Sequence, residues 1–381
     1  MRVYLDHNAT TPMRPEARDE LVRCVDELGG NPSSLHASGR AARQVLDASR
    51  ERVAEALAVH EDEIVFTASG TESDNLALFG ALAPQDASRG LLTTAVEHSA
   101  VLAAADELER TGRPVHRVRV DELGNPDLAE LGEQASTGSY GLVSVMGANN
   151  EVGTLGPLDE LASVLPKKHR PLVHTDAVQM LGRVPVELAR WNVDLATFSA
   201  HKVGGPLGVG ILVRKLGVST GAMLHGGGQE HGLRPGTENV PAVAAAALAI
   251  ELAVQEQADY ERHTRDLSRA FWRQVQSVLP EARLNGPDID SDRRLPNTLN
   301  VALGDVDGRV LVTRLDLAGL EVSAGSACAS GSLEPSHVLR AMGLSDERAR
   351  AGLRVSFGRT STAEQVRVAV DVLRRTFSPT H

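Results

Sequence analysis

The chain has 381 residues, of which 42% are hydrophobic and 23% charged, a composition typical of a soluble globular protein with about two domains. Its formal net charge of -11 argues against non-specific binding to nucleic acid or to an anionic membrane surface, so we expect neither partner. The N-terminus has no signal-peptide pattern, the most apolar run (240–254) is too short to span a membrane, and two cysteines make no disulfide framework, so we expect a cytoplasmic protein.

Strand-like and helical segments alternate through the first two thirds of the chain. A helical pattern covers 14–28, and another begins at Pro157. The predicted strands, several of which run on into a turn or loop, lie within these segments: 63–70, 90–98, 141–153, 171–179, 193–202 and 209–215. This alternation predicts an α/β fold with a mostly parallel sheet that helices cover on both faces.

The pattern changes after about Pro241. One long helical stretch runs to about Leu279, strand-like segments follow at 297–303 and 353–358, and a last helix starts at Ser361 with a capping-box spacing to Glu364. We expect a large domain at 12–255. The smaller α+β domain is expected to combine 1–11 with 256–381 and to carry Cys328.

Potentially reactive side chains fall where the predicted strands end. They are Thr71, His98, Asn149, Asp176, Ser199, His201 and Lys202. In open α/β sheets, ligands bind outside the carboxyl ends of the strands, so these residues are predicted to converge on one site although they span over 130 positions.

Lys202 follows a strand and precedes a glycine-rich turn, VGGPLG. It is either a solvated loop lysine or an amine that forms a Schiff base, a role that enclosure favours by lowering its pKa. Ser199 and His201 can donate to a phosphate. Asp176 suits a metal ligand, a helix cap or the partner of a pyridinium nitrogen, and Gln179 can point at the same space. Because a strand follows the glycines, they match neither a dinucleotide loop nor a P-loop.

Gly70 and Thr71 precede a helical pattern and can offer backbone N–H groups and a hydroxyl to an anion. The spacing of Thr71 and Asp74 also fits a capping box, and the two interpretations are compatible. His98 is either a buried structural histidine or a ring stacked on a planar cofactor. The histidines show no close metal-ligand spacing with carboxylates or cysteine pairs, so we expect no resident metal.

Cys328 lies in SAGSACASGS, where its neighbours are small, and this favours an accessible, reactive thiol. Cys24, on a helical pattern beside leucines and valines, is interpreted as structural. Arg354 begins a predicted strand, where its guanidinium either grips a carboxylate with two parallel hydrogen bonds or forms a surface ion pair.

Nine motifs in chain order resemble the cysteine desulfurases of the NifS/IscS type, in the class V aminotransferase family. They are YLDHNATTP, FTASGTESDNLAL, EHSAV, NNEVG, HTDAVQ, FSAHKVGGPLGVG, GGGQEHGLRPGTENVP, SAGSACAS and LRVSFGR. Any one is weak, but the series covers nearly the whole chain. The resemblance implies the type I fold of pyridoxal 5'-phosphate enzymes, acting as a homodimer.

The resemblance also implies roles toward that cofactor. Lys202 would form the Schiff base, Asp176 would pair with the ring nitrogen, and His98 would stack on the ring. Gln179 would contact the ring oxygen, with Asn149 near that oxygen and the substrate. Four residues would hold the phosphate: Gly70, Thr71, Ser199 and His201.

Three further roles are implied. Thr237 would reach the phosphate of the neighbouring subunit, Arg354 would bind the carboxylate of L-cysteine, and Cys328 would accept the sulfur as a persulfide while L-alanine leaves. The only metal role expected is for Cys328 as a transient ligand of an iron–sulfur cluster held with a partner. His231 and Pro235 depart from the residues common in the family at the subunit boundary.

The expected function is therefore a pyridoxal phosphate-dependent cysteine desulfurase that passes sulfur to an acceptor, such as an iron–sulfur scaffold or a sulfur carrier. The chain ends soon after its last helix, which weakens the expectation of an IscU-type scaffold. A selenocysteine lyase, an aminotransferase and a non-catalytic scaffold protein stay open as alternatives.

Overall fold

A computed structural model describes residues 2–304, 306–325 and 334–377. Its main sheet has seven strands in the order β2-β8-β7-β6-β5-β3-β4, in which β8 is antiparallel to both neighbours and every other pair is parallel. The strands are β2 (Ile64–Thr67), β3 (Gly90–Thr94), β4 (Val115–Val118), β5 (Tyr140–Ser144), β6 (Leu172–Asp176), β7 (Leu195–Ser199) and β8 (Gly210–Arg214). The mostly parallel sheet predicted from the alternating pattern is confirmed.

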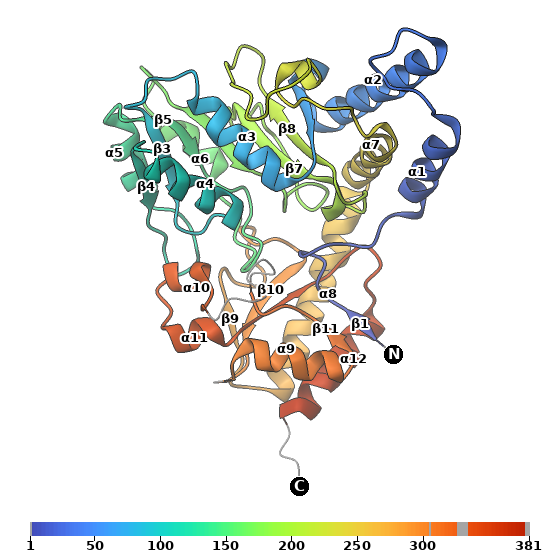
Figure 1. The fold of residues 1–381 in the computed structure, drawn as a ribbon. Coiled ribbons are helices and arrows are strands. Elements are labelled where there is room, and N and C mark those ends of the chain that lie inside the picture. The colour runs from blue at the N-terminus through green and yellow to red at the C-terminus, as the bar shows by residue number, and fades with distance from the viewer. Residues whose placement is uncertain (1, 305, 326–333, 378–381) are drawn as a thin grey trace.

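Helices cover both faces of this sheet (Figure 1). Successive strand residues enter two different hydrophobic clusters, as Leu142 and Val143 of β5 do, because neighbouring side chains of a strand point to opposite faces. One cluster contains α3 (Gly70–Leu82) and α4 (Ser99–Arg110). The other contains α2 (Ala37–Leu57), α5 (Leu128–Ser136), α6 (Leu158–Val164) and α7 (Val240–Gln255), and α1 (Pro15–Glu27) packs on α7.

A second unit has its own core and lies below the sheet in Figure 1. Its strands are β1 (Val3–Tyr4), β9 (Arg283–Asn285), β10 (Thr298–Ala302), β11 (Leu320–Glu321) and β12 (Gly352–Ser356). They form an antiparallel sheet, β12-β10-β9, and a parallel pair, β1-β11. Its helices are α8 (Gln257–Val278), α9 (Gly308–Leu317), α10 (His337–Ala341), α11 (Asp346–Arg350) and α12 (Ala363–Phe377).

The break between the two units falls at Glu256, where α7 and α8 meet at 70°. The long helical stretch after Pro241 is thus two helices, and Val3 and Leu5 pack in the core of the second unit. Both observations agree with our division at 255/256, which stays a proposal. No single described helix is long and apolar enough to cross a membrane, although the bent α7–α8 pair passes that test by length and composition together.

Two caps differ from those predicted. Helix α3 is capped by Ser69, whose side chain accepts from the Glu72 N–H at 3.1 Å, and not by Thr71 paired with Asp74. At the N-terminus of α12, Thr362 and Gln365 exchange hydrogen bonds, one position beyond the predicted pair. In both cases several Ser and Thr residues stand close together, and spacing alone does not choose among them. Single-turn helices complete the fold: η1 (Glu61–Glu63), η2 (Ala200–Lys202) and η3 (Glu230–Gly232).

Candidate active site

A cavity of about 220 Å³ lies at the carboxyl ends of β6 and β7, where Asp176 and Ser199 are the last strand residues. Nine residues singled out from the sequence line it: Gly70, Thr71, His98, Asp176, Gln179, Ser199, His201, Lys202 and Arg354. The convergence follows from topology, because parallel strands bring their carboxyl ends to one edge of the sheet. Here the residues of the main-sheet unit meet Arg354 of β12, which belongs to the second unit, so the cavity lies between the two units.

Lys202 closes the turn η2 at the end of β7 and is half-buried. Its ammonium Nζ donates to the backbone carbonyls of Asn8 at 2.6 Å and Ala9 at 2.7 Å. The turn that follows β1 thus holds the amine at the cavity wall. Asn8 and Ala9 belong to the YLDHNATTP motif, whose role the sequence did not reveal.

Asp176 and His98 both line the cavity, where Asp176 is buried and His98 is half-buried. Burial raises the pKa of Asp176, while the nearby His98 and Lys202 lower it, and Oδ1 accepts from the Val178 N–H at 2.9 Å. His98 caps α4, its Nδ1 accepting from the Ala100 N–H at 3.2 Å. In the neutral ring the remaining proton is therefore on Nε2. The site combines a buried carboxyl with an aromatic ring of defined orientation.

The N-terminus of α3 borders the cavity, and its first turn presents backbone N–H groups of the kind that bind anions. A Cβ placed on Gly70 would come 3.2 Å from Val178 and 3.5 Å from Ser199, so a larger residue would crowd these side chains at the start of α3. His201 also lines the cavity, and its Nδ1 lies 3.0 Å from Thr10 Oγ1. Burial lowers the pKa of His201 to about 4, with smaller contributions from Lys202 and Arg183. At neutral pH the His201 ring is therefore an uncharged hydrogen-bonding group.

Gln179 connects the cavity with a buried guanidinium. Its Nε2 donates to the Asn8 carbonyl at 3.2 Å, and its Oε1 accepts from Arg183, which also donates to Asn8 Oδ1 at 2.9 Å. Burial lowers the pKa of Arg183. Gln179 is held by both neighbours and offers the cavity a side chain of restricted motion.

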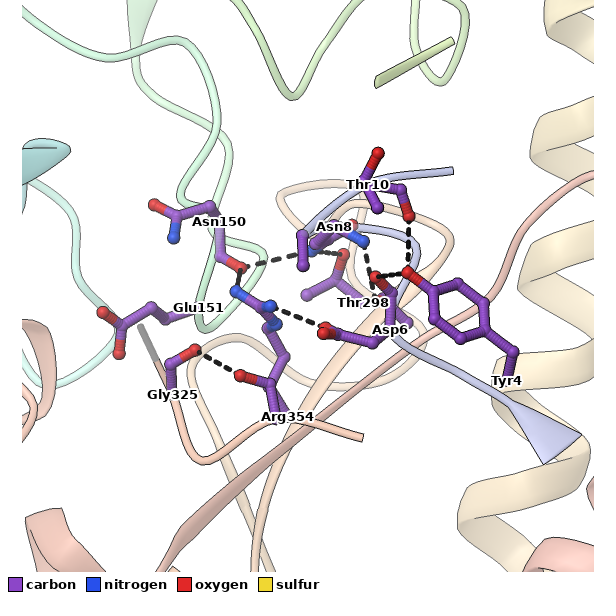
Figure 2. A network of polar contacts seen from close by, with 12 residues as sticks. Tyr4, Asp6, Asn8, Thr10, Asn150, Glu151, Thr298, Gly325 and Arg354 are labelled. Atoms are coloured by element: carbon purple, nitrogen blue, oxygen red, sulfur yellow. Dashed lines mark hydrogen bonds and ion pairs between the residues drawn. The ribbon is translucent and has the colours of Figure 1, made fainter. Parts of the chain in front are cut away.

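Arg354 is 1% exposed and reaches the cavity from β12 (Figure 2). Its Nη2 donates to Asp6 Oδ1 at 2.7 Å and its Nη1 to the Asn150 carbonyl at 3.2 Å. Its buried Nε has no hydrogen-bond acceptor within the described part of the chain. A buried guanidinium with spare donor capacity, facing a cavity, suits a carboxylate ligand.

Two predicted site residues lie outside the cavity lining. The amide of Asn149 is used by backbone: Nδ2 donates to Val96 O at 3.0 Å, and Oδ1 accepts from the Glu151 and Val152 N–H groups. Its neighbour Asn150 lines the cavity instead. Thr237 is exposed and borders a different cavity.

Cys328 lies outside the described residues. The nearest described strand contact is Ser323, which exchanges backbone hydrogen bonds of 2.7 and 3.1 Å with Arg354.

The other cysteine has a different environment. Cys24 is fully buried on α1, and burial raises the pKa of its thiol. A raised pKa leaves little thiolate, which is the nucleophilic form. This agrees with the structural role predicted for Cys24.

Asp74 was missed as a site residue because its spacing from Thr71 suggested a cap. It lines the cavity, is 1% exposed, and its pKa is raised well above the usual range, first by burial and then by Asp176. Its burial was not visible in the sequence, since the hydrophobic pattern of α3 runs around the whole helix.

Comparisons with known proteins give one consistent family. Residues 3–368 match the model of the class-V aminotransferases. The chain is 41% identical to the cysteine desulfurase IscS of Dictyoglomus turgidum, over 98% of this chain and 94% of that protein, and 43% identical to a cysteine desulfurase of Cereibacter sphaeroides, over 98% and 95%. A solved NifS-like protein covers 99% of both chains at 37% identity with a TM-score of 0.92, and a structure titled SspA in complex with cysteine matches at 29%, covering 94% of this chain and all of that one, with a TM-score of 0.79.

Proposed function

We propose that this chain uses pyridoxal 5'-phosphate to move the sulfur of L-cysteine onto Cys328. The chain belongs to the class-V aminotransferase family and is a cysteine desulfurase. The observation that carries this proposal is the arrangement of Lys202, Asp176 and His98 in one cavity with Arg354. An amine, a buried acid, a ring and a carboxylate-binding guanidinium are the groups that this chemistry requires.

The residues present fit the cofactor. The N-terminus of α3 with Gly70, Thr71, Ser199 and His201 suits its phosphate, and the buried Asp176 suits a protonated ring nitrogen. When bound, the cofactor supplies an electron sink for the bonding electrons released at the substrate Cα. The ionised form of Asp176 is the one that keeps the ring nitrogen protonated.

The chain's own groups then handle the substrate. Arg354 binds the carboxylate of L-cysteine, and Lys202 Nζ takes the proton from Cα. The thiolate of Cys328 attacks the substrate sulfur: an S–S bond forms while the C–S bond breaks, and its electron pair stays with the carbon that becomes the methyl group of L-alanine. His98, which lines the cavity, exchanges protons with the substrate thiol in this proposal.

Arg354→Gln is expected to raise the KM for L-cysteine by about 10- to 100-fold, because the substrate carboxylate loses its hydrogen bonds to a charged group. The effect on kcat should be smaller. Steady-state kinetics of alanine formation measures both constants. The substitution also leaves Asp6 without its cation, so Asp6→Asn/Arg354→Gln serves as the control. If the double variant regains a normal KM, Arg354 does not bind substrate.

We propose that the enzyme is a homodimer in which Thr237 contacts the cofactor phosphate of the partner. The exposure of Thr237 supports this. Its segment is anchored by Glu230, which forms two hydrogen bonds with Arg50 at 2.6 and 3.0 Å and accepts from the Phe66 N–H at 2.7 Å. Glu230 and His231 both adopt positive φ, 47° and 59°, so this turn depends on its anchor.

Glu230→Gln is expected to lower the free energy of unfolding by about 3–5 kcal/mol, because it leaves the Arg50 cation buried without its counter-charge. Urea denaturation measures this loss. Glu251→Gln, which removes the partner of Arg52 in a pair that is more than one third exposed, is the matched control and should cost less than about 1 kcal/mol. Equal losses in the two variants would show that the Glu230 anchor is not special.

The sulfur acceptor is proposed to be a cytoplasmic iron–sulfur scaffold or sulfur carrier. The purified protein should be yellow and should form L-alanine from L-cysteine. Incubation with labelled L-cysteine and candidate acceptors should move the label from Cys328 to one of them. A colourless protein that forms no alanine when supplied with the cofactor would refute the proposal and favour a non-catalytic scaffold.

A further inference from the structure

Two carboxyl groups from different elements lie together at the buried end of the active-site cavity. Asp74 of α3 and Asp176 of β6 line it, at 1% and 5% exposure. One ligand atom of each, and one of His98, lie within 4.8 Å of one another. Asp74 Oδ1 is buried and accepts no hydrogen bond from the described residues. The established roles of a cysteine desulfurase site account for Asp176 but not for this second acid.

The groups facing Asp74 do not neutralise it. His174 of β6 has Nε2 only 3.6 Å from Asp74 Oδ1, but burial lowers the pKa of His174 to about 3, so its ring is neutral. Glu97, from the connection before α4, is buried as well, and burial raises its pKa to about 8. Lys202 and His98 lower the pKa of Asp176.

A neutral hydrogen-bonded chain runs across the neighbouring strands β5, β6 and β7 to this pair. Ser144 Oγ lies 2.9 Å from His174 Nδ1, and His174 Nε2 lies 3.1 Å from Thr197 Oγ1. A hydrogen bond between the Thr197 side chain and Asp74 completes the chain and lowers the pKa of Asp74 only in part. With burial and a second carboxyl opposing its ionisation, the favourable state of Asp74 is the neutral acid.

We propose that Asp74 carries a proton that it shares with Asp176, so that the two carboxyls together present one negative charge to the ring nitrogen of the cofactor. Two close carboxyls cannot both ionise in a buried site, and the protonated one donates a hydrogen bond that stabilises its ionised partner. Asp74 is thus a positioning residue that acts through Asp176. The inference rests on the proposed cofactor.

The first test uses the cofactor-free protein. A carboxyl whose pKa is raised by folding contributes stability that is complete below its unfolded pKa and is lost as pH rises through the folded value. Relative to Asp74→Asn, wild-type protein should therefore lose stability as pH rises above the unfolded pKa of an aspartate, about 3.9. Glu97 is present in both proteins, and its charge also raises the pKa of Asp74. Identical pH profiles would overturn proton sharing.

The second test uses the loaded protein and two variants of similar size. Asn is uncharged but keeps a hydrogen-bond donor. Leu is uncharged and has no hydrogen-bond donor. Asp74→Asn should bind pyridoxal phosphate within about threefold of wild type at neutral pH, whereas Asp74→Leu should bind at least about tenfold more weakly. The acid limit of the cofactor's visible absorbance should move to higher pH in Asp74→Leu only.

The outcomes separate the two proposals. If Asp74→Asn is as weak as Asp74→Leu, an ionised Asp74 is required, and the inference is wrong. If both variants behave as wild type, Asp74 has no role toward the cofactor. If wild type binds no pyridoxal phosphate, the proposed function fails, while the profiles of the cofactor-free protein still decide whether the carboxyls share a proton.

Discussion

Lys202→Ala is expected to abolish alanine formation from L-cysteine, by at least about 10³-fold, and to leave no borohydride-reducible link between protein and cofactor. Both losses have one physical cause, because in the proposed mechanism Nζ is both the amine that bonds the cofactor and the base that takes the Cα proton. The backbone carbonyls of Asn8 and Ala9 hold this amine at the cavity wall. Among the described residues that line the cavity, no other is a lysine.

The measurement is borohydride reduction followed by peptide mapping, with alanine quantified in parallel. Lys215→Ala is the matched control, since Lys215 is an exposed lysine just beyond β8, the strand that pairs with β7. That variant should retain the link and the activity. A reducible adduct at another lysine in Lys202→Ala would disprove the assignment.

Cys328→Ser is expected to separate binding from sulfur transfer. The variant should stay yellow and should bind L-cysteine, because none of the described residues that line the cavity is changed. It should lose nearly all alanine formation, since a hydroxyl at neutral pH does not attack sulfur as a thiolate does. Visible absorbance and alanine production, measured on one preparation, provide the two readouts.

Cys24→Ala is the control for this experiment, and it should keep desulfurase activity because the Cys24 thiol is buried and its pKa is raised. The same pair of variants separates the alternative activities. A selenocysteine lyase would act on selenocysteine without Cys328, and an aminotransferase would regain turnover with keto acids. Normal turnover of L-cysteine by Cys328→Ser would rule out the persulfide mechanism.

Much of the site was predictable because one rule of topology gathers it. Asp176 and Ser199 end strands and Lys202 follows one, and parallel strands place such residues at one edge. The hydrophobic pattern likewise predicted a sheet buried on both faces. These features depend on local sequence and on spacing along the chain, which a single sequence displays.

The remaining features depend on contacts between distant segments. Arg354 pairs with Asp6, 348 positions away, and no local pattern indicates that partner. Asn149 and Asn150 are adjacent and chemically identical, but the turn uses the amide of the first and leaves the second at the cavity. Asp74 resembles a surface or capping residue until the packing of α3 against β6 and β7 is known.

The most direct test of the account is mass spectrometry of the protein after one turnover with L-cysteine. We predict one added sulfur atom on the peptide that contains Cys328, with one L-alanine released for each sulfur bound, and no addition to Cys24. Alanine released without sulfur on Cys328, or with the sulfur on Cys24, would contradict the account.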